Sequence, residues 1–422
     1  MTGSMPSDCF DYGRGHTSLA AALDLLKSRL QPLAGTETVP LAGASGRVLA
    51  QHLTSPRPVP AFDNAAVDGF AFAAASQPQT GPVRLALIPG RAAAGHPVVD
   101  VVPSGHAIRV LTGAALPHGT DTVAMNEEVQ VEDSTVVLAR PLTANSNRRR
   151  AGEDVGAGQR LFGEGIVLGP MHIGVAAEIG LDSLPVFRRL RVALHSSGDE
   201  LRAPGRVLDA GGVFDANRFV LQAMLCQLPV EVTDFGILPD SAEAVRAALL
   251  ESAEGHDVVL TSGGASKGDE DHVVRTVEAH GRLDFWQIAM KPGRPLAFGR
   301  LLRAVTIGLP GNPVAAAVCF MRLARPVIAR LAGSKWLEPQ AFWVPAAFNF
   351  VKKPGRTEFL RARLTVNPET RIPRAELIRR QGSGILTSLT DADGLIELEP
   401  NVTLIEPGNP VRFFSFAELG AA

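Results

Sequence analysis

The chain has 422 residues, of which 45% are hydrophobic and 20% charged, so it holds enough apolar material for two to four domains with cores of their own. Its 41 lysines and arginines nearly balance 43 aspartates and glutamates, so no overall charge favours nucleic acid or an acidic membrane surface. We find no apolar run near the roughly 18 residues of a membrane span and no apolar signal-peptide core. The three cysteines form no C-x-x-C pair, which favours a reducing cytoplasm over disulfides or zinc.

The first half of the chain predicts a β-domain inserted into a helical one. Residues 1–16, rich in Gly, Ser and Asp, are typical of a flexible tail. After them, leucines recur at helical spacing from Leu19 to Leu30, which predicts an amphipathic helix. Short apolar runs broken by glycine predict a β-rich domain over 51–145. We expect 17–50 and 146–187 to form a helical domain around it.

The second half predicts an α/β domain followed by a β-domain. Strand-like and helix-like runs alternate over residues 188–335, which calls for a mostly parallel sheet covered by helices. Residues 336–422 lose the helical pattern and predict a barrel-like C-terminal β-domain. The expected fold class is therefore a multidomain α/β protein. In such sheets, ligands bind beyond the C-terminal ends of the strands.

Polar and glycine-rich loops follow the predicted strands of the α/β domain. They are residues 196–200 (SSGDE), 239–240 (PD), 261–271 (TSGGASKGDED), 291–295 (KPGRP) and 309–313 (LPGNP). Glycines let backbone N–H groups approach an anion, and Lys291 and Arg294 add positive charge. Acids outnumber these bases, so a divalent ion such as Mg²⁺ is needed between the acids and an anionic ligand.

Each of these features also has a structural interpretation. Asp240 is placed to cap the helix that follows it, and Asn312 followed by Pro313 suits the first positions of another helix. Glu200 and Lys291 can be ordinary surface charges, and the glycines can be ordinary turns. His195 and His272 are isolated histidines, which are more often structural than ligands.

Residues 264–268 match G-x-S-x-G, the nucleophile elbow of serine hydrolases. An elbow places its serine where the strand ends, whereas the apolar run here ends near Leu260 and two glycines intervene before Ser266. His280 also lies about 13 Å along the predicted helix from Asp271. Hydrolysis by Ser266 is therefore disfavoured. The chain has neither a P-loop nor a dinucleotide-binding glycine motif.

Eight segments in order resemble the molybdopterin molybdenumtransferases, the bacterial MoeA proteins and the C-terminal domain of gephyrin. They are PAFDNAAVDGFAF, LTGAALPHGTDTVAMNEE, RRRAGEDVGAGQ, SSGDEL, GGVFDAN, TSGGASKGDED, AMKPGRPLAFG and LPGNPVAAAVCF. The resemblance runs from about Ser18 to Phe416. Adenylylating pterin-binding proteins and competence-damage proteins share only the sheet domain.

The resemblance implies a Mg²⁺-dependent cytoplasmic enzyme that inserts molybdenum from molybdate into adenylylated molybdopterin and releases AMP. It also implies a homodimer, with 17–50 and 146–187 as an elongated helical dimerisation domain. In this dimer the β-domain of one subunit completes the cleft over the sheet of the other. A molybdopterin adenylyltransferase or molybdoenzyme chaperones are the implied protein partners. Whether molybdate or tungstate is preferred stays open, because the two oxyanions are nearly alike in size and charge.

The resemblance also gives the expected site residues. The implied catalytic set is Asp68, Thr112, Asp154, Glu200, Asp240, Asp271 and Lys291. Within it, Glu200, Asp240 and Asp271 would bind the metal. The implied substrate-binding residues are Ser197, Gly198, Gly263, Gly264, Ser266, Pro292, Gly293, Arg294, Pro310, Gly311 and Asn312.

The sequence departs from the family pattern beside Lys291. Gln287 stands where many members carry a lysine, and Arg294 replaces a frequent lysine. Two other functions remain as alternatives. One is a dimeric scaffold that presents a groove to a partner peptide, as the gephyrin domain does, and the other is a nucleotide pyrophosphatase.

Overall fold

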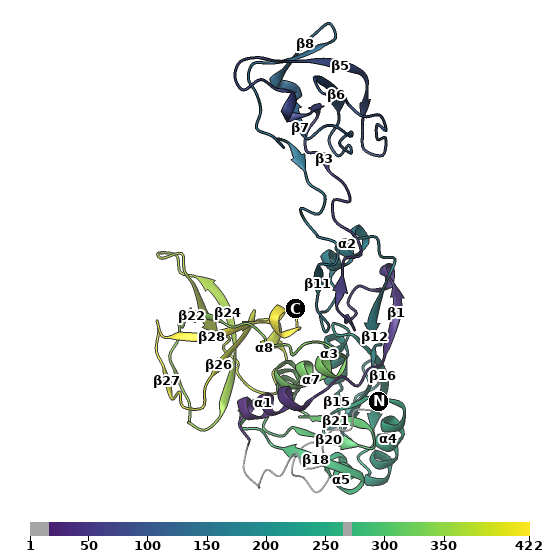
Figure 1. Cartoon of the computed structure of the whole chain (residues 1–422). Coiled ribbons are helices and arrows are strands. Elements are labelled where there is room, and N and C mark those ends of the chain that lie inside the picture. Colours follow the sequence, from purple (N-terminus) through teal and green to yellow (C-terminus); the bar gives the residue numbers. More distant parts are fainter. Residues whose placement is uncertain (1–16, 265–271) are drawn as a thin grey trace. The chain divides into compact units, whose positions relative to one another are not determined.

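The structure, a computed structural model, describes residues 17–264 and 272–422 and divides into two compact units (Figure 1). The first unit holds the described residues up to Gln51, together with Glu164–Gly169 and Leu184–Ala422. The second holds His52–Gly163 and Pro170–Ser183. In the described residues, no helix is long and apolar enough to cross a membrane.

The first unit is built on a six-stranded sheet in the order β16-β13-β17-β21-β20-β18. Four strands are parallel: β13 (Leu190–Ser197), β16 (Val230–Leu238), β17 (Val258–Ser262) and β21 (Ala304–Leu309). The sheet is completed by β20 (Ala297–Leu301), which pairs antiparallel with β21, and by β18 (Gly281–Trp286), which pairs antiparallel with β20 and so runs in the direction of the four parallel strands. The predicted mostly parallel sheet is therefore confirmed.

Helices cover both faces of this sheet. The apolar side chains of one face pack against α4 (Ala242–Gly255) and α5 (His272–His280). The other packs against α1 (Leu19–Arg29), α3 (Asn217–Leu225), α6 (Pro313–Cys319) and α7 (Arg325–Leu331). A π-helical turn, Phe320–Ala324, joins α6 to α7. The predicted N-terminal helix begins at Leu19, capped by Ser18 Oγ, which accepts from Ala21 N at 3.1 Å.

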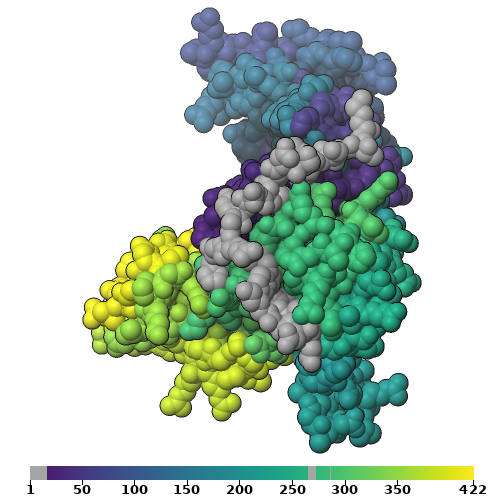
Figure 2. Space-filling model, turned by 90° about the horizontal axis from the view of Figure 1, so that it is seen from below, coloured from purple at the N-terminus to yellow at the C-terminus, as the bar shows by residue number. Residues whose placement is uncertain are grey.

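The C-terminal β-domain shares a core with the α/β domain. Its main sheet contains β19 (Met290–Lys291), β24 (Thr357–Val366), β26 (Gly394–Leu398), β28 (Pro410–Ser415) and β22 (Phe342–Pro345), while β25 (Pro373–Leu377) pairs with β24. Strand β19 comes from the KPGRP loop and so carries that loop into this sheet. Phe359, Leu395 and Phe414 join the large core of the α/β domain. Figure 2 shows the two domains, in green and yellow, directly against each other.

Short elements complete the first unit. They are β1 (Thr36–Pro40) paired with β12 (Ser183–Phe187), β14 (Leu201–Arg202) with β15 (Val213–Phe214), β23 (Phe350–Val351) with β27 (Leu404–Ile405), and the short helices α8 (Thr387–Thr390) and α9 (Phe416–Leu419).

The second unit is rich in β-strands. Its sheet has the order β7 (Thr122–Met125), β4 (Gly69–Phe72), β6 (His106–Val110), β5 (Val83–Ala92), β9 (Thr135–Leu138) and β8 (Val129–Glu132). Apolar side chains fill both faces. The unit also holds the pairs β3 (Asn64–Ala65) with β10 (Arg148–Arg149) and β2 (Leu53–Thr54) with β11 (Arg160–Phe162), and helix α2 (Pro170–Glu178). Segment 146–187 thus contains more strand than its apolar pattern indicated.

Candidate functional site

The four parallel strands end at one edge of the sheet, which brings the predicted loops together. Ser197 at the end of β13 pairs with Leu238 at the end of β16, and Ser262 at the end of β17 pairs with Leu309 at the end of β21. Because paired residues lie side by side, the loops that begin after these residues start next to one another. The four loops that follow these strands therefore begin side by side, as predicted; of the loop 261–271, only residues up to 264 are described.

The acidic loops after β13 and β16 contact each other. The backbone N–H of Asp240 donates to Asp199 Oδ1 at 2.9 Å. The side chain of Glu200 folds back over its own loop. Its Oε2 lies so close to Gly198 that a Cβ atom added at Gly198 would be only 2.5 Å away. Ser241, not Asp240, is the N-cap of α4, so the capping interpretation of Asp240 is wrong. Oδ1 of Asp240 instead lies 4.0 Å from Nε2 of His272.

The predicted metal triad is only partly within the described residues. Glu200 and Asp240 lie on adjoining loops, whereas Asp271 and Ser266 lie outside the described residues. Within residues 17–264 and 272–422, no group of three or more His, Cys, Asp or Glu side chains is arranged to hold a metal. Helix α5 ends at His280, as predicted.

The turn after β17 requires glycine. Gly263 has a φ of +91°, and a Cβ there would lie 2.2 Å from the carbonyl oxygen of Ser197. Its own N–H donates to Leu309 O at 3.1 Å, so the turn passes directly over the end of β13 while bonded to β21. Any side chain would push this turn off its neighbours.

Asn217, at the start of α3, joins two of these loops. Its Nδ2 donates to Ser262 Oγ at 2.8 Å and to Gly311 O at 2.7 Å. This residue belongs to the segment GGVFDAN, and the sequence indicated no role for it. No local pattern predicts the contacts, because they span 45 and 94 residues of chain.

A cavity of about 420 Å³ lies between the KPGRP and LPGNP loops and the C-terminal β-domain. Its cationic lining residues are Lys291, Arg294, Arg356 and Arg361; the predicted residues Pro292, Gly293, Pro310 and Asn312 also line it. We call it the cationic pocket. Asn312 is the N-cap residue of α6, with Pro313 at N1, but it makes no side-chain capping bond. Gly311 lies against Gly263, which connects the pocket to the glycine turn.

Two of the pocket cations have polar neighbours that the sequence did not indicate. Lys291 Nζ donates to Glu358 Oε1 at 2.6 Å, and that carboxylate is buried. Arg294 Nη2 donates to Gln287 Oε1 at 3.2 Å. The departures from the family pattern at positions 287 and 294 are thus in direct contact with each other.

Arg361 is the most unusual residue of the cationic pocket because its charge is buried. The residue is only 1% exposed. The described part of the chain gives its guanidinium three neutral oxygens: Ser388 Oγ at 3.2 Å, Gly382 O at 3.3 Å and Arg380 O at 3.5 Å. Burial lowers the pKa of Arg361 to about 10, so the group stays charged at neutral pH. The nearby charge of Glu358 offsets part of the cost of burial, and a buried cation whose hydrogen bonds go to neutral oxygens suits an anionic ligand beside it.

His195 has the structural role that its isolation suggested. It is fully buried, its Nε2 lies 2.7 Å from Ser252 Oγ, and its ring stacks on Phe235 with centroids 4.8 Å apart. Burial lowers its pKa to about 4, so the imidazole is neutral at physiological pH.

In the second unit, Asp68 and Thr112 form the pair that the resemblance implied. Thr112 donates to Asp68 Oδ1 twice, from its hydroxyl and from its backbone N–H, each at 2.7 Å. These hydrogen bonds hold the pKa of Asp68 below its usual range, and the one from the hydroxyl has the larger effect. The exposed carboxylate is therefore fixed in direction and remains ionised.

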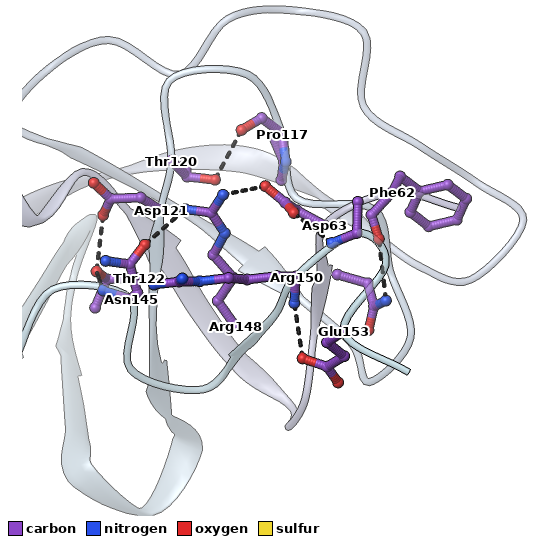
Figure 3. A network of polar contacts seen from close by, with 12 residues as sticks. Phe62, Asp63, Pro117, Thr120, Asp121, Thr122, Asn145, Arg148, Arg150 and Glu153 are labelled. Carbon is purple, nitrogen blue, oxygen red and sulfur yellow. Dashed lines mark hydrogen bonds and ion pairs between the residues drawn. The ribbon is translucent and has the colours of Figure 1, made fainter. Parts of the chain in front are cut away.

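The segment that carries Asp154 is held by the network in Figure 3. Arg148 binds the carboxylate of Asp63 and donates to Asn145 Oδ1 at 2.7 Å. Asp63 Oδ1 also accepts from Ala151 N at 2.8 Å, and Glu153 Oε2 accepts from Arg150 N at 3.0 Å. The exposed Asp154 follows directly and donates its N–H to Val59 O. The described members of the implied catalytic set are thus divided between the units, with Asp68, Thr112 and Asp154 in the second.

We expect Thr112→Val to raise the pKa of Asp68 toward the ordinary value, because only the backbone hydrogen bond would remain. Titration of the carboxyl carbon by NMR measures this. Thr120→Val is the matched control, since its hydroxyl donates to Pro117 O. An unchanged Asp68 titration in Thr112→Val would contradict the role given to the hydroxyl.

Comparison with known proteins places this geometry in a family. Residues 17–180 match the MoeA N-terminal region (domain I and II), 193–330 a probable molybdopterin binding domain, and 344–416 the MoeA C-terminal region (domain IV). The chain is 37% identical to a molybdopterin molybdenumtransferase of Haemophilus influenzae over 91% of this chain and 95% of that protein. It is 32% identical to one of Synechococcus elongatus over 94% and 98%.

A solved structure agrees with these matches. The molybdopterin biosynthesis moeA protein of Pyrococcus horikoshii superimposes with a TM-score of 0.82 at 27% identity, covering 95% of this chain and 100% of that one. The chain therefore belongs to the MoeA family of molybdopterin molybdenumtransferases, transferases of molybdenum cofactor biosynthesis.

Proposed function

We propose that this enzyme transfers molybdenum from molybdate to adenylylated molybdopterin and releases AMP, with the oxyanion bound in the cationic pocket. The observation that carries the proposal is Arg361, a buried cation in the pocket lining whose hydrogen bonds all go to neutral oxygens, although Glu358 lies near enough to interact with its charge. Arg294 and Arg356 line the same cavity. A unit anion 4 Å from one such cation gains about 4 kcal/mol at an effective dielectric constant of 20.

Lys291 would complete the cation set. Its ammonium group is held by the buried Glu358, which fixes where the charge lies while the side chain remains 62% exposed. An anion that approaches Lys291 therefore meets a positioned donor. Arg294, which donates to Gln287 Oε1, would contribute a further cation to the same lining.

The substrate phosphates would bind at the sheet edge beside the cationic pocket. The glycine turn at Gly263 contacts Gly311, and the neighbours of Gly311 line the pocket. This continuity supports a phosphate group and an oxyanion as neighbours. Backbone N–H groups and cations would stabilise the negative charge on the departing AMP.

Glu200 and Asp240, together with Asp271, would hold a Mg²⁺ ion. Carboxylate oxygens are the ligands that Mg²⁺ prefers, and the contact between the acidic loops brings two of these acids onto adjoining segments. When bound, the ion would offset the charge of the substrate phosphates. These acids would otherwise repel the substrate.

We further infer a cytoplasmic homodimer in which Asp68, Thr112 and Asp154 of one subunit serve the cleft of the other. The support is the exposed Asp68 carboxylate, which two hydrogen bonds from Thr112 hold in a fixed direction. The adenylylated substrate requires an upstream adenylyl transfer, so a molybdopterin adenylyltransferase is the expected supplier.

AMP release distinguishes this activity from the scaffold and pyrophosphatase alternatives. Purified protein incubated with adenylylated molybdopterin should release AMP only when molybdate is present. Release without molybdate would indicate a pyrophosphatase, and no release under either condition would indicate a scaffold.

In the same assay, Arg361→Ala should raise the KM for molybdate at least tenfold, as expected for a lost charge-assisted contact. Arg363→Ala is the matched control, because this arginine lies on the same strand but donates to Asp391 O, outside the cationic pocket. Arg361→Lys keeps the positive charge and is the second variant to test if Arg361→Ala does not fold. An unchanged KM in a folded Arg361→Ala enzyme would exclude this pocket as the oxyanion site.

Mixed dimers test the shared cleft. Asp68→Ala and Lys291→Ala homodimers should each be nearly inactive, whereas a mixed dimer regains one cleft with both residues intact. Activity should therefore return to about a quarter of the wild-type value when equal amounts of the two variants are mixed at random. Mixed dimers without activity would contradict a cleft shared between subunits.

A further inference from the structure

We infer that Asn217 is a positioning residue that fastens the glycine turn after β17 to the LPGNP loop after β21. This inference rests on the proposed function, since both loops carry residues assigned to the substrate. It adds a residue to which neither the sequence nor the comparisons give a role.

The geometry of the amide is the first support. One Nδ2 group uses both of its hydrogens, on Ser262 Oγ at 2.8 Å and on Gly311 O at 2.7 Å. Ser262 is 2% exposed and immediately precedes the turn, while Gly311 lies between two residues of the cationic pocket. A single side chain therefore sets the spacing between the two parts of the proposed site.

The position of Asn217 on its helix is the second support. It is the first residue of α3, whose start is held by buried Asp215. Asp215 accepts from Arg218 N at 3.2 Å and from Arg218 Nε at 3.0 Å, and Arg218 also pairs with Asp234 on β16. The helix packs into the main core through Leu221 and Leu225. The amide thus extends from a rigid element, and the two loops take their position from it.

The strain of the turn explains why a clamp is needed. Gly263 and Gly264 both have positive φ angles, +91° and +67°, and the first is in close contact with Ser197. Within the described residues, the turn is bonded to the LPGNP side through Gly263 N to Leu309 O and through the Asn217 bridge. Loss of the bridge should allow the two loops to open separately while the sheet stays folded.

Three full-length variants test the clamp, with AMP and Mg²⁺ as the binding probe. Asn217→Ala removes both hydrogen bonds. Asn217→Asp keeps the shape and can still accept from the rotatable Ser262 hydroxyl, but its carboxylate repels Gly311 O. Gln227→Ala is the matched control, because it removes the hydrogen bond from a side-chain amide to Ala422 O, just beyond the other end of α3.

We expect AMP affinity by calorimetry to fall at least fivefold in Asn217→Ala and to be unchanged in Gln227→Ala. Backbone amide hydrogen exchange should be faster at 258–264 and 305–312 in Asn217→Ala, which loses both contacts. In Asn217→Asp it should be faster only at 305–312, because the contact with Ser262 remains.

Wild-type affinity and protection in Asn217→Ala would overturn the inference. If the wild-type protein binds no AMP, the proposed function fails instead. The exchange measurement still decides between a clamp and a residue with no effect on the loops.

Discussion

The site depends on one close approach, the passage of the turn at Gly263 over the carbonyl end of β13. A Cβ at this position would lie 2.2 Å from Ser197 O, so the chain can make the turn only with glycine. This approach brings the end of β17 against β13 on one side and Gly311 on the other. The acidic loops and the cationic pocket become parts of one edge for this reason.

Charges are separated along that edge. Asp199, Glu200 and Asp240 lie on the loops after β13 and β16, whereas Lys291, Arg294 and Arg361 line the pocket beside the LPGNP loop. This arrangement suits a substrate that binds a metal ion at one end and an oxyanion at the other. The C-terminal β-domain is necessary for the separation, because it supplies Arg361 and the carboxylate that holds Lys291.

Much of the sheet edge was predictable because its signals are local. Apolar runs such as 258–262 end at glycine or polar residues, and parallel strands must end together. The cationic pocket was not predictable in this way. Arg361 reaches the KPGRP loop across about 70 residues of sequence, and only a charged residue inside the apolar run FLRARL signals it. Asn217 and the network around Arg148 likewise depend on contacts between distant segments.

The central claim is that an oxyanion and a pterin nucleotide meet at this edge, on opposite sides of the Gly263–Gly311 contact. A crystal structure of the protein with molybdate and adenylylated molybdopterin measures it directly. The account predicts molybdate density beside Arg361 in the cationic pocket and phosphate density beside the glycine turn. Both ligands bound elsewhere, with the pocket and the turn empty, would contradict it.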